Sequence, residues 1–247
     1  MSCQQLSGHG PAEAEPGDGT DRLPERLAAV EARISAACAE AGRPRAAVTL
    51  IAVGKTRPAT DLRRLAGLGV SDFGENRDQE AAPKAATLAD LSLRWHFVGR
   101  LQTNKCRSVA RYAAVVHSVD RPDLVGALGT AARRAGRPLT ALVQVSLDGD
   151  PGRGGALPAD IPRLADAIVA EDGLELGGVM GIGPLGGDPV AAFAKLAEVA
   201  DRVRSAYPQA AAISAGMTDD LEPAIAAGAT YVRVGTALFG RRPPPLR

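Results

Sequence analysis

Eight short apolar segments alternate with helix-like segments along most of this chain. The apolar runs are rich in Val, Ile and Leu, and most of them stop at glycine or polar residues, as buried strands do. They cover residues 48–55, 70–73, 93–98, 114–119, 139–146, 176–180, 211–214 and 231–234. Strands that alternate with helices form a mostly parallel sheet, either closed into a (β/α)8 barrel or open and doubly wound. The count of eight, and the glycine-containing or polar segments after nearly every strand, favour the barrel.

The flanking regions differ in composition from the alternating part. Residues 1–20 are mostly Gly, Pro, Ser, Glu and Asp, which predicts a disordered tail. An amphipathic helix is predicted over residues 21–42, where apolar side chains recur at spacings of three and four. With 247 residues the chain is long enough for one large core. We therefore expect one barrel domain over residues 21–241, followed by a flexible tail at 242–247.

Composition excludes several classes of function. A net charge of +1 argues against nucleic acid or an anionic membrane as a partner, and 3% aromatic residues argue against a base-stacking surface. Cys3, Cys38 and Cys106 are too far apart for a disulfide framework or a zinc site. Without a signal-peptide pattern or an apolar run of transmembrane length, we expect a cytoplasmic protein. The Ala- and Arg-rich surface helices predict a monomer.

The first strand ends at Lys55, which is unusual in this chain. Lysine occurs only at Lys55, Lys84, Lys105 and Lys195, and arginine supplies the other 25 of the 29 basic residues. A buried ammonium group is costly unless it is paired, deprotonated or used chemically, and lysine readily lowers its pKa for nucleophilic work. The alternative is that Lys55 extends to solvent or pairs with a carboxylate.

Two glycine-containing turns follow the last two strands, where barrels commonly bind phosphate. They are residues 214–220 and 235–237, and both lead into helical chain whose backbone N–H groups could bind an anion. Taken singly, the first is explained by helix capping and the second by an ordinary tight turn. Together with an amine on the first strand, they suggest a phosphorylated aldehyde held as an imine.

Several separated motifs resemble the family of pyridoxal phosphate homeostasis proteins, barrels related to the N-terminal domain of bacterial alanine racemase. The motifs are Ile51-Ala-Val-Gly-Lys-Thr56, Phe73-Gly-Glu-Asn-Arg-Asp-Gln-Glu80, Trp95-His-Phe-Val-Gly-Arg-Leu-Gln-Thr-Asn-Lys105, His117-Ser-Val-Asp120, Gly178-Val-Met-Gly-Ile182, Gly216-Met-Thr-Asp-Asp220 and Val232-Arg-Val-Gly-Thr-Ala237. They span nearly everything from Asp21 to Gly240. Their number and order make the resemblance far more specific than any single motif.

The resemblance implies a cofactor site for pyridoxal 5′-phosphate (PLP). Lys55 matches the lysine that forms the internal aldimine, and desolvation at the strand end would favour its neutral form. Arg233 matches the arginine that faces the pyridine nitrogen, and its alternation with Val232 and Val234 points it away from the valines; the alternative is an internal salt bridge. The remaining matched positions are the phosphate cradle Met217, Thr218, Gly235 and Thr236, with Ser214 and Gly216 in the same turn, and Asn76 and Met180 near the cofactor.

Other residues in the motifs have simpler explanations or depart from the family. We expect His96 and His117 to be hydrogen-bonded core histidines, Asn76 could instead cap a helix, and Met180 could be core. Arg100 stands where the family commonly has histidine, and the loop 148–155 is richer in glycine than usual. We expect neither departure to affect the site.

The resemblance raises the question of catalysis. Alanine racemases need a second, β-rich domain that supplies a tyrosine base, and this sequence ends soon after the eighth strand. Tyr112 and Tyr207 fall on outer helices, and Tyr231 begins a strand at the opposite end of the barrel. With no second base and an arginine at the pyridine nitrogen, we expect a carrier that buffers PLP, with apo forms of PLP-dependent enzymes as recipients. A PLP-dependent amino-acid racemase and a Schiff-base aldolase remain the alternatives.

Overall fold

The computed structural model describes residues 22–240, and the tails predicted at 1–20 and 242–247 lie outside this range. The strands are β1 (Thr49–Val53), β2 (Asp72–Glu75), β3 (Arg94–Phe97), β4 (Ala113–Val119), β5 (Leu139–Val145), β6 (Leu174–Gly181), β7 (Ala212–Ser214) and β8 (Tyr231–Val234). The α-helices are α1 (Leu23–Glu40), α2 (Ala59–Gly67), α3 (Asp78–Thr87), α4 (Cys106–Tyr112), α5 (Pro122–Ala135), α6 (Ile161–Ala170), α7 (Pro189–Ala206), α8 (Leu221–Ala226) and α9 (Thr236–Phe239). Three short 3-10 turns are η1 (Arg45–Ala47), η2 (Thr103–Lys105) and η3 (Pro151–Arg153).

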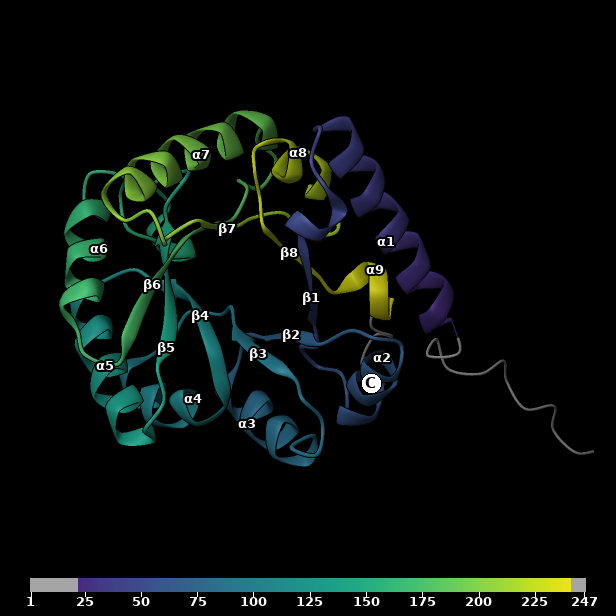
Figure 1. The fold of residues 1–247 in the computed structure, drawn as a ribbon, viewed down its shortest axis with the longest axis horizontal. Coiled ribbons are helices and arrows are strands. Elements are labelled where there is room, and N and C mark those ends of the chain that lie inside the picture. The colour runs from purple at the N-terminus through teal and green to yellow at the C-terminus, as the bar shows by residue number, and fades with distance from the viewer. Residues whose placement is uncertain (1–21, 241–247) are drawn as a thin grey trace, which may run out of the picture.

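The eight strands form a closed parallel barrel in sequence order, with helices around the outside (Figure 1). β1 is hydrogen-bonded to β2 on one side and to β8 on the other, so the sheet has no free edge. This closure confirms the predicted (β/α)8 fold and excludes the open, doubly wound sheet.

Alternation along each strand separates an outer apolar layer from the barrel interior. On β8, Val232 and Val234 pack with residues of α1 and α8 in the outer layer, while Arg233 points the other way, into the barrel. Successive side chains of a strand point to opposite faces, so the strand places a charged residue inside without disturbing the outer core. The predicted direction of Arg233 is confirmed.

The amphipathic helix predicted over residues 21–42 is α1. It begins with Pro24 in its first turn and buries one face, made of Leu23, Val30, Ile34, Ala37 and Cys38. The helix contacts α8 and α9, and so covers the outside of the barrel beside β8 and β1 (Figure 1). Within residues 22–240, no helix combines the length and the apolar character needed to cross a membrane.

The main boundary error in the sequence prediction concerns β2. We predicted a strand at residues 70–73, but β2 runs from Asp72 to Glu75 and pairs residue by residue with β3. The register with β3 decides this boundary, because local composition places Gly74 and Glu75 in a turn. The shift buries Glu75 completely.

Candidate functional site

A cavity of about 360 Å³ lies at the carboxyl ends of the barrel strands. It brings together seven of the ten residues predicted for the site: Lys55, Asn76, Met217, Thr218, Arg233, Gly235 and Thr236. Sequence reasoning did not assign the other lining residues to the site: Val53, Val98, Gly99, Arg100, Gln144, Arg153, Ile182 and Asp219.

The charge of the lining is strongly unbalanced. Among all the residues that line the cavity, four side chains are basic and one is acidic. The basic ones are Lys55, Arg100, Arg153 and Arg233, and the acidic one is Asp219. A concave site with one sign of charge concentrates ligands of the opposite sign. The cavity is therefore suited to an anionic small molecule.

The lysine of the site lies past the end of its strand. β1 stops at Val53, and Lys55 is an exposed residue in the turn that follows. The backbone N–H of Arg57 donates to the carbonyl of Gly54 at 3.0 Å and closes a four-residue turn with Lys55 in its second position. The expectation that burial at the strand end activates Lys55 is therefore wrong, because the strand ends two residues too early to enclose the amine.

Helix α3 holds the backbone on both sides of Lys55. Lys84 donates from Nζ to the carbonyl of Gly54 at 2.8 Å, and Glu80 accepts from the backbone N–H of Thr56 at 2.7 Å. Thr56 has φ of +64°, a conformation that costs a residue other than glycine about 1–2 kcal/mol. These two hydrogen bonds keep the strained turn in place, so the position of Lys55 depends on α3.

The turns after β7 and β8 present unpaired backbone donors. Among the described residues, the N–H groups of Thr218, Asp219 and Thr236 have no hydrogen-bond partner. Thr218 Oγ1 accepts from the N–H of Ala237 at 3.4 Å, which ties the two turns together. The N–H of Met217, another predicted member of the phosphate cradle, donates to Asp220 Oδ1 at 2.6 Å in this structure.

Three predicted site residues lie off the cavity lining. Ser214 and Met180 are completely buried inside the barrel, one layer below the cavity, where Met180 packs against Val115 and Leu142. Gly216 shapes the turn after β7: its φ is +87°, and a Cβ there would approach Ala224 Cβ within 2.7 Å. These residues support the cavity from below and from the side.

Arg233 is a buried cation held by neutral groups. Its Nη1 donates to Ser214 Oγ at 2.6 Å and its Nη2 donates to the carbonyl of Gly181 at 2.9 Å. Burial lowers the pKa of the guanidinium to about 10, so it remains charged at neutral pH. No carboxylate within residues 22–240 forms an ion pair with it, which removes the salt-bridge alternative for this part of the chain.

Asn76 follows β2 directly and does not cap α3, whose N-cap residue is Arg77. Its side-chain Oδ1 is buried without a hydrogen-bond partner among the described residues. Its backbone lies so close to Gly99 that a Cβ at position 99 would come within 2.1 Å of the Asn76 carbonyl oxygen. The close packing with Gly99 fixes the backbone of Asn76 beside the cavity, and its side-chain oxygen has no partner among the described residues.

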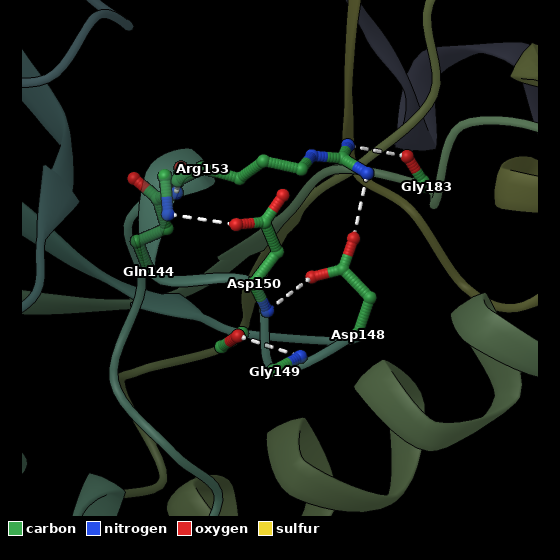
Figure 2. A network of polar contacts seen from close by, with 8 residues as sticks. Gln144, Asp148, Gly149, Asp150, Arg153 and Gly183 are labelled. Carbon is green, nitrogen blue, oxygen red and sulfur yellow. Dashed lines mark hydrogen bonds and ion pairs between the residues drawn. The ribbon is translucent and has the colours of Figure 1, made fainter.

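The glycine-rich loop after β5 contributes Arg153 to the cavity lining, a contact that the sequence analysis did not anticipate. Arg153 donates from Nη1 to Asp148 Oδ2 at 2.7 Å and from Nη2 to the carbonyl of Gly183 at 2.6 Å (Figure 2). Gln144, at the end of β5, donates to the carbonyl of Arg153 at 3.1 Å. Arg153 thus joins the loop after β5 to the loop after β6. The glycine content was the only sequence signal for this contact.

Fold and cavity together define a (β/α)8 barrel protein with a cationic cavity that contains an exposed lysine. The family model for the alanine racemase N-terminal domain matches residues 26–243. The chain is 43% identical to the pyridoxal phosphate homeostasis protein of Mycobacterium tuberculosis, over 91% of this chain and 95% of that protein. It is 36% identical to the Escherichia coli protein of the same name, over 89% of this chain and 97% of that one. The chain belongs to the pyridoxal phosphate homeostasis protein family.

Solved structures agree with this assignment. PipY of Synechococcus elongatus, solved with PLP bound, superposes with a TM-score of 0.76 at 36% identity, over 88% of this chain and all of that one. Alanine racemase from Streptomyces coelicolor superposes with a TM-score of 0.66 at 20% identity, over 88% of this chain and 59% of the racemase. The second likeness shows a shared fold only.

Proposed function

We propose that this protein binds PLP in the cavity and holds it through Lys55, as part of intracellular PLP homeostasis. The observation that carries the proposal is the exposed primary amine of Lys55 in a cavity lined by three arginines and two turns with free N–H groups. PipY, a relative of the same family, has been solved with PLP bound. When bound, PLP supplies an aldehyde carbon that condenses reversibly with a lysine amine and releases water.

Each group of residues has a proposed task. The N–H groups of Thr218, Asp219 and Thr236, with the threonine hydroxyls, bind the phosphate. Arg233 would bind the ring through its remaining N–H groups, and a cation beside the ring nitrogen would disfavour protonation of that nitrogen and weaken the ring's capacity to accept electrons. Asn76 offers its amide to the ring substituents. The chain thus binds the cofactor firmly while limiting its reactivity.

The described cavity lining contains no tyrosine, the residue that serves as the second base in alanine racemases. None of the three tyrosines lines the cavity: Tyr112 ends α4, Tyr207 follows α7, and Tyr231 packs against the rings of His96 and His117 inside the barrel. We therefore propose that the protein is a carrier and buffer of PLP without racemase activity, with apo-enzymes as recipients. An aldolase for sugar phosphates would use the same lysine without PLP.

A loading experiment separates these functions. Purified protein incubated with PLP should retain about one equivalent through gel filtration and should transfer it to an apo-enzyme added in excess. In heavy water, the loaded protein should exchange the α-proton of alanine no faster than free PLP does. Exchange well above that rate would contradict the carrier proposal, and covalent capture of a sugar phosphate in place of PLP would favour the aldolase.

Arg153 should slow the release of PLP, because it lines the cavity and joins the loops after β5 and β6. Replacing Arg153 by glutamine removes the bonds to Asp148 and Gly183, and PLP should dissociate about two- to tenfold faster, the effect of net hydrogen-bond energies near 0.5–1.5 kcal/mol. Stopped-flow transfer to an apo-enzyme measures the rate. Arg134→Gln, an exposed change on α5, is the control. An unchanged rate in the Arg153 variant would show that the loop contact does not retain the cofactor.

A further inference from the structure

A chain of hydrogen bonds crosses the barrel interior and ends at Arg233. It starts at Asp72, the first residue of β2, and passes through β3, β4 and β7 before reaching β8. The contacts are His96 Nε2 to Asp72 Oδ1 at 2.8 Å, His96 Nδ1 to His117 Nε2 at 2.9 Å, His117 Nδ1 to Ser214 Oγ at 2.9 Å and Arg233 Nη1 to Ser214 Oγ at 2.6 Å. We call these five residues the relay.

The relay occupies a region that barrels usually fill with aliphatic side chains. His96, His117 and Ser214 are 0% exposed, and Asp72 and Arg233 are 9% and 5% exposed. Burying polar groups stabilises a fold only when every donor and acceptor is matched, and Val or Leu at these positions would fill the barrel without that requirement. The fold alone therefore gives no reason for the relay, which leads instead from the far end of the barrel to the cavity.

The two ends of the relay together set the direction of every hydrogen bond. The Asp72 carboxylate only accepts, so His96 donates to it from Nε2 and accepts at Nδ1 from His117. At the other end arginine only donates, so Ser214 Oγ accepts from Arg233 and directs its own hydrogen to Nδ1 of His117, which carries no proton. His117 then carries its proton on Nε2 and donates to Nδ1 of His96. His96 in turn carries its proton on Nε2 and donates to Asp72, which ends the relay with a carboxylate. With the opposite tautomers, an unprotonated ring nitrogen of His96 would face the carboxylate.

The surroundings favour this set of protonation states. Burial lowers the pKa of His96, although the carboxylate beside it opposes the shift. The pKa of His117 is also lowered, by burial first and then by His96, Arg233 and Arg94. Burial opposes the charged form of Asp72, but hydrogen bonds from His96 and Ser71 outweigh it and hold the pKa of that carboxyl below its usual value. The ring of Tyr231 packs against both histidines at 5.5 and 5.7 Å.

We propose that Asp72, His96, His117 and Ser214 are positioning residues, which hold the Arg233 guanidinium in one orientation toward the cofactor ring. This inference rests on the proposed binding of PLP. Every bond dipole in the relay presents its negative end to Arg233 and its positive end to Asp72, so the relay stabilises a cation that has no carboxylate partner of its own. Two of the five guanidinium N–H groups are used by Ser214 and Gly181, and within residues 22–240 the other three have no partner and so can bind a ligand.

The protonation pattern can be read without any cofactor. Nitrogen-15 NMR of histidine-labelled apo-protein at pH 7, in a His9→Gln background, should show His96 and His117 both neutral with the proton on Nε2. In a second apo-protein sample labelled at arginine, the Arg233 side-chain N–H signals should be sharp and slow to exchange. A protonated ring or an Nδ1–H tautomer at either histidine would overturn the inference, whatever the protein binds.

The positioning role is tested by Ser214→Ala, with Ser118→Ala as the matched control. Ser118 is a completely enclosed serine beside His117, and its Oγ has no hydrogen-bond partner among the described residues. Ser214→Ala should speed the exchange of the Arg233 N–H signals, weaken PLP binding about tenfold, as expected for one hydrogen bond to a charged group, and change the visible absorption spectrum of bound PLP. Ser118→Ala should change none of these.

A second variant acts from the far end of the relay. Asp72→Asn keeps an acceptor for His96 but removes the charge, and should alter the spectrum of bound PLP in the same direction by a smaller amount. If wild-type protein holds PLP and both relay variants leave its affinity and spectrum unchanged, the inference is wrong. If wild-type protein does not hold PLP, the proposed function fails instead, and the NMR signals of the apo-protein still decide the relay.

Discussion

Replacing Lys55 by alanine should abolish the covalent adduct that borohydride reduction traps between this protein and PLP. The reason is chemical: among the residues that line the cavity, Lys55 supplies the only primary amine. Mass spectrometry of peptides assigns the modified residue without ambiguity, since the chain holds only four lysines. Lys55→Arg should also lose the adduct but retain weak, reversible binding, because it keeps the positive charge.

Lys105→Ala is the matched control for this experiment. Lys105 lines a neighbouring cavity that shares Asn76 and Arg100 with the site. Its replacement should leave the adduct intact. A reduced adduct that persists in the Lys55→Ala variant, on Lys105 or on any other lysine, would refute the assignment of Lys55.

The second large effect concerns stability. Replacing Lys84 by methionine should lower the free energy of unfolding by about 3–5 kcal/mol at neutral pH, the range for removing one partner of a buried ion pair. Glu75 is 0% exposed, its Oε1 accepts from Lys84 Nζ at 2.7 Å, and its Oε2 has no partner among the described residues. The substitution would leave this carboxylate buried and uncompensated. Urea unfolding of the apo-protein measures the loss.

The loss should depend on pH in a defined direction. Burial raises the pKa of Glu75 above its ordinary 4.5, and Lys84 opposes that rise, so the pKa rises further in the Lys84→Met variant. The folded variant then binds a proton that the unfolded chain does not, between the raised pKa and about 4.5. The difference in the free energy of unfolding between wild type and the Lys84→Met variant should therefore shrink as the pH falls through this window.

Two further variants distinguish this explanation from simple loss of packing. The double variant Glu75→Gln with Lys84→Met removes both charges and should recover most of the stability at pH 7. Arg63→Ala breaks an exposed pair with Asp90 and should change stability little. An equal deficit in the single and double variants, at all pH values, would show that the charge of Glu75 is not the cause.

Much of the fold could be predicted because its determinants are local. The alternation of strands and helices, the amphipathic face of α1 and the inward direction of Arg233 each follow from spacings of two to four residues. The anion-ready turns after β7 and β8 could be found for a similar reason, since the barrel fold itself brings the last two loops together.

The errors have one physical cause, which is that side-chain partners come from distant segments. Lys55 was expected to be buried, but the turn that α3 holds leaves it exposed. Arg100 and Arg153 were not assigned to the site from the sequence, yet both line the cavity. Nothing in their own neighbourhoods indicates this, because loops from different strands meet only when the barrel closes.

The sequence by itself therefore determined the barrel fold and the family to which this chain belongs, and it singled out Lys55 as a candidate site residue. The tertiary structure decided how the site is held. His96 and His117 were predicted to be hydrogen-bonded in the core, but the sequence did not indicate their partners. His96 is 24 residues from Asp72 and 21 from His117, and His117 is 97 residues from Ser214. Barrel closure and register set such pairings, and no local pattern records them. The hydrogen bonds of the relay to Arg233, and those of α3 to the turn that holds Lys55, are therefore visible only in the folded structure.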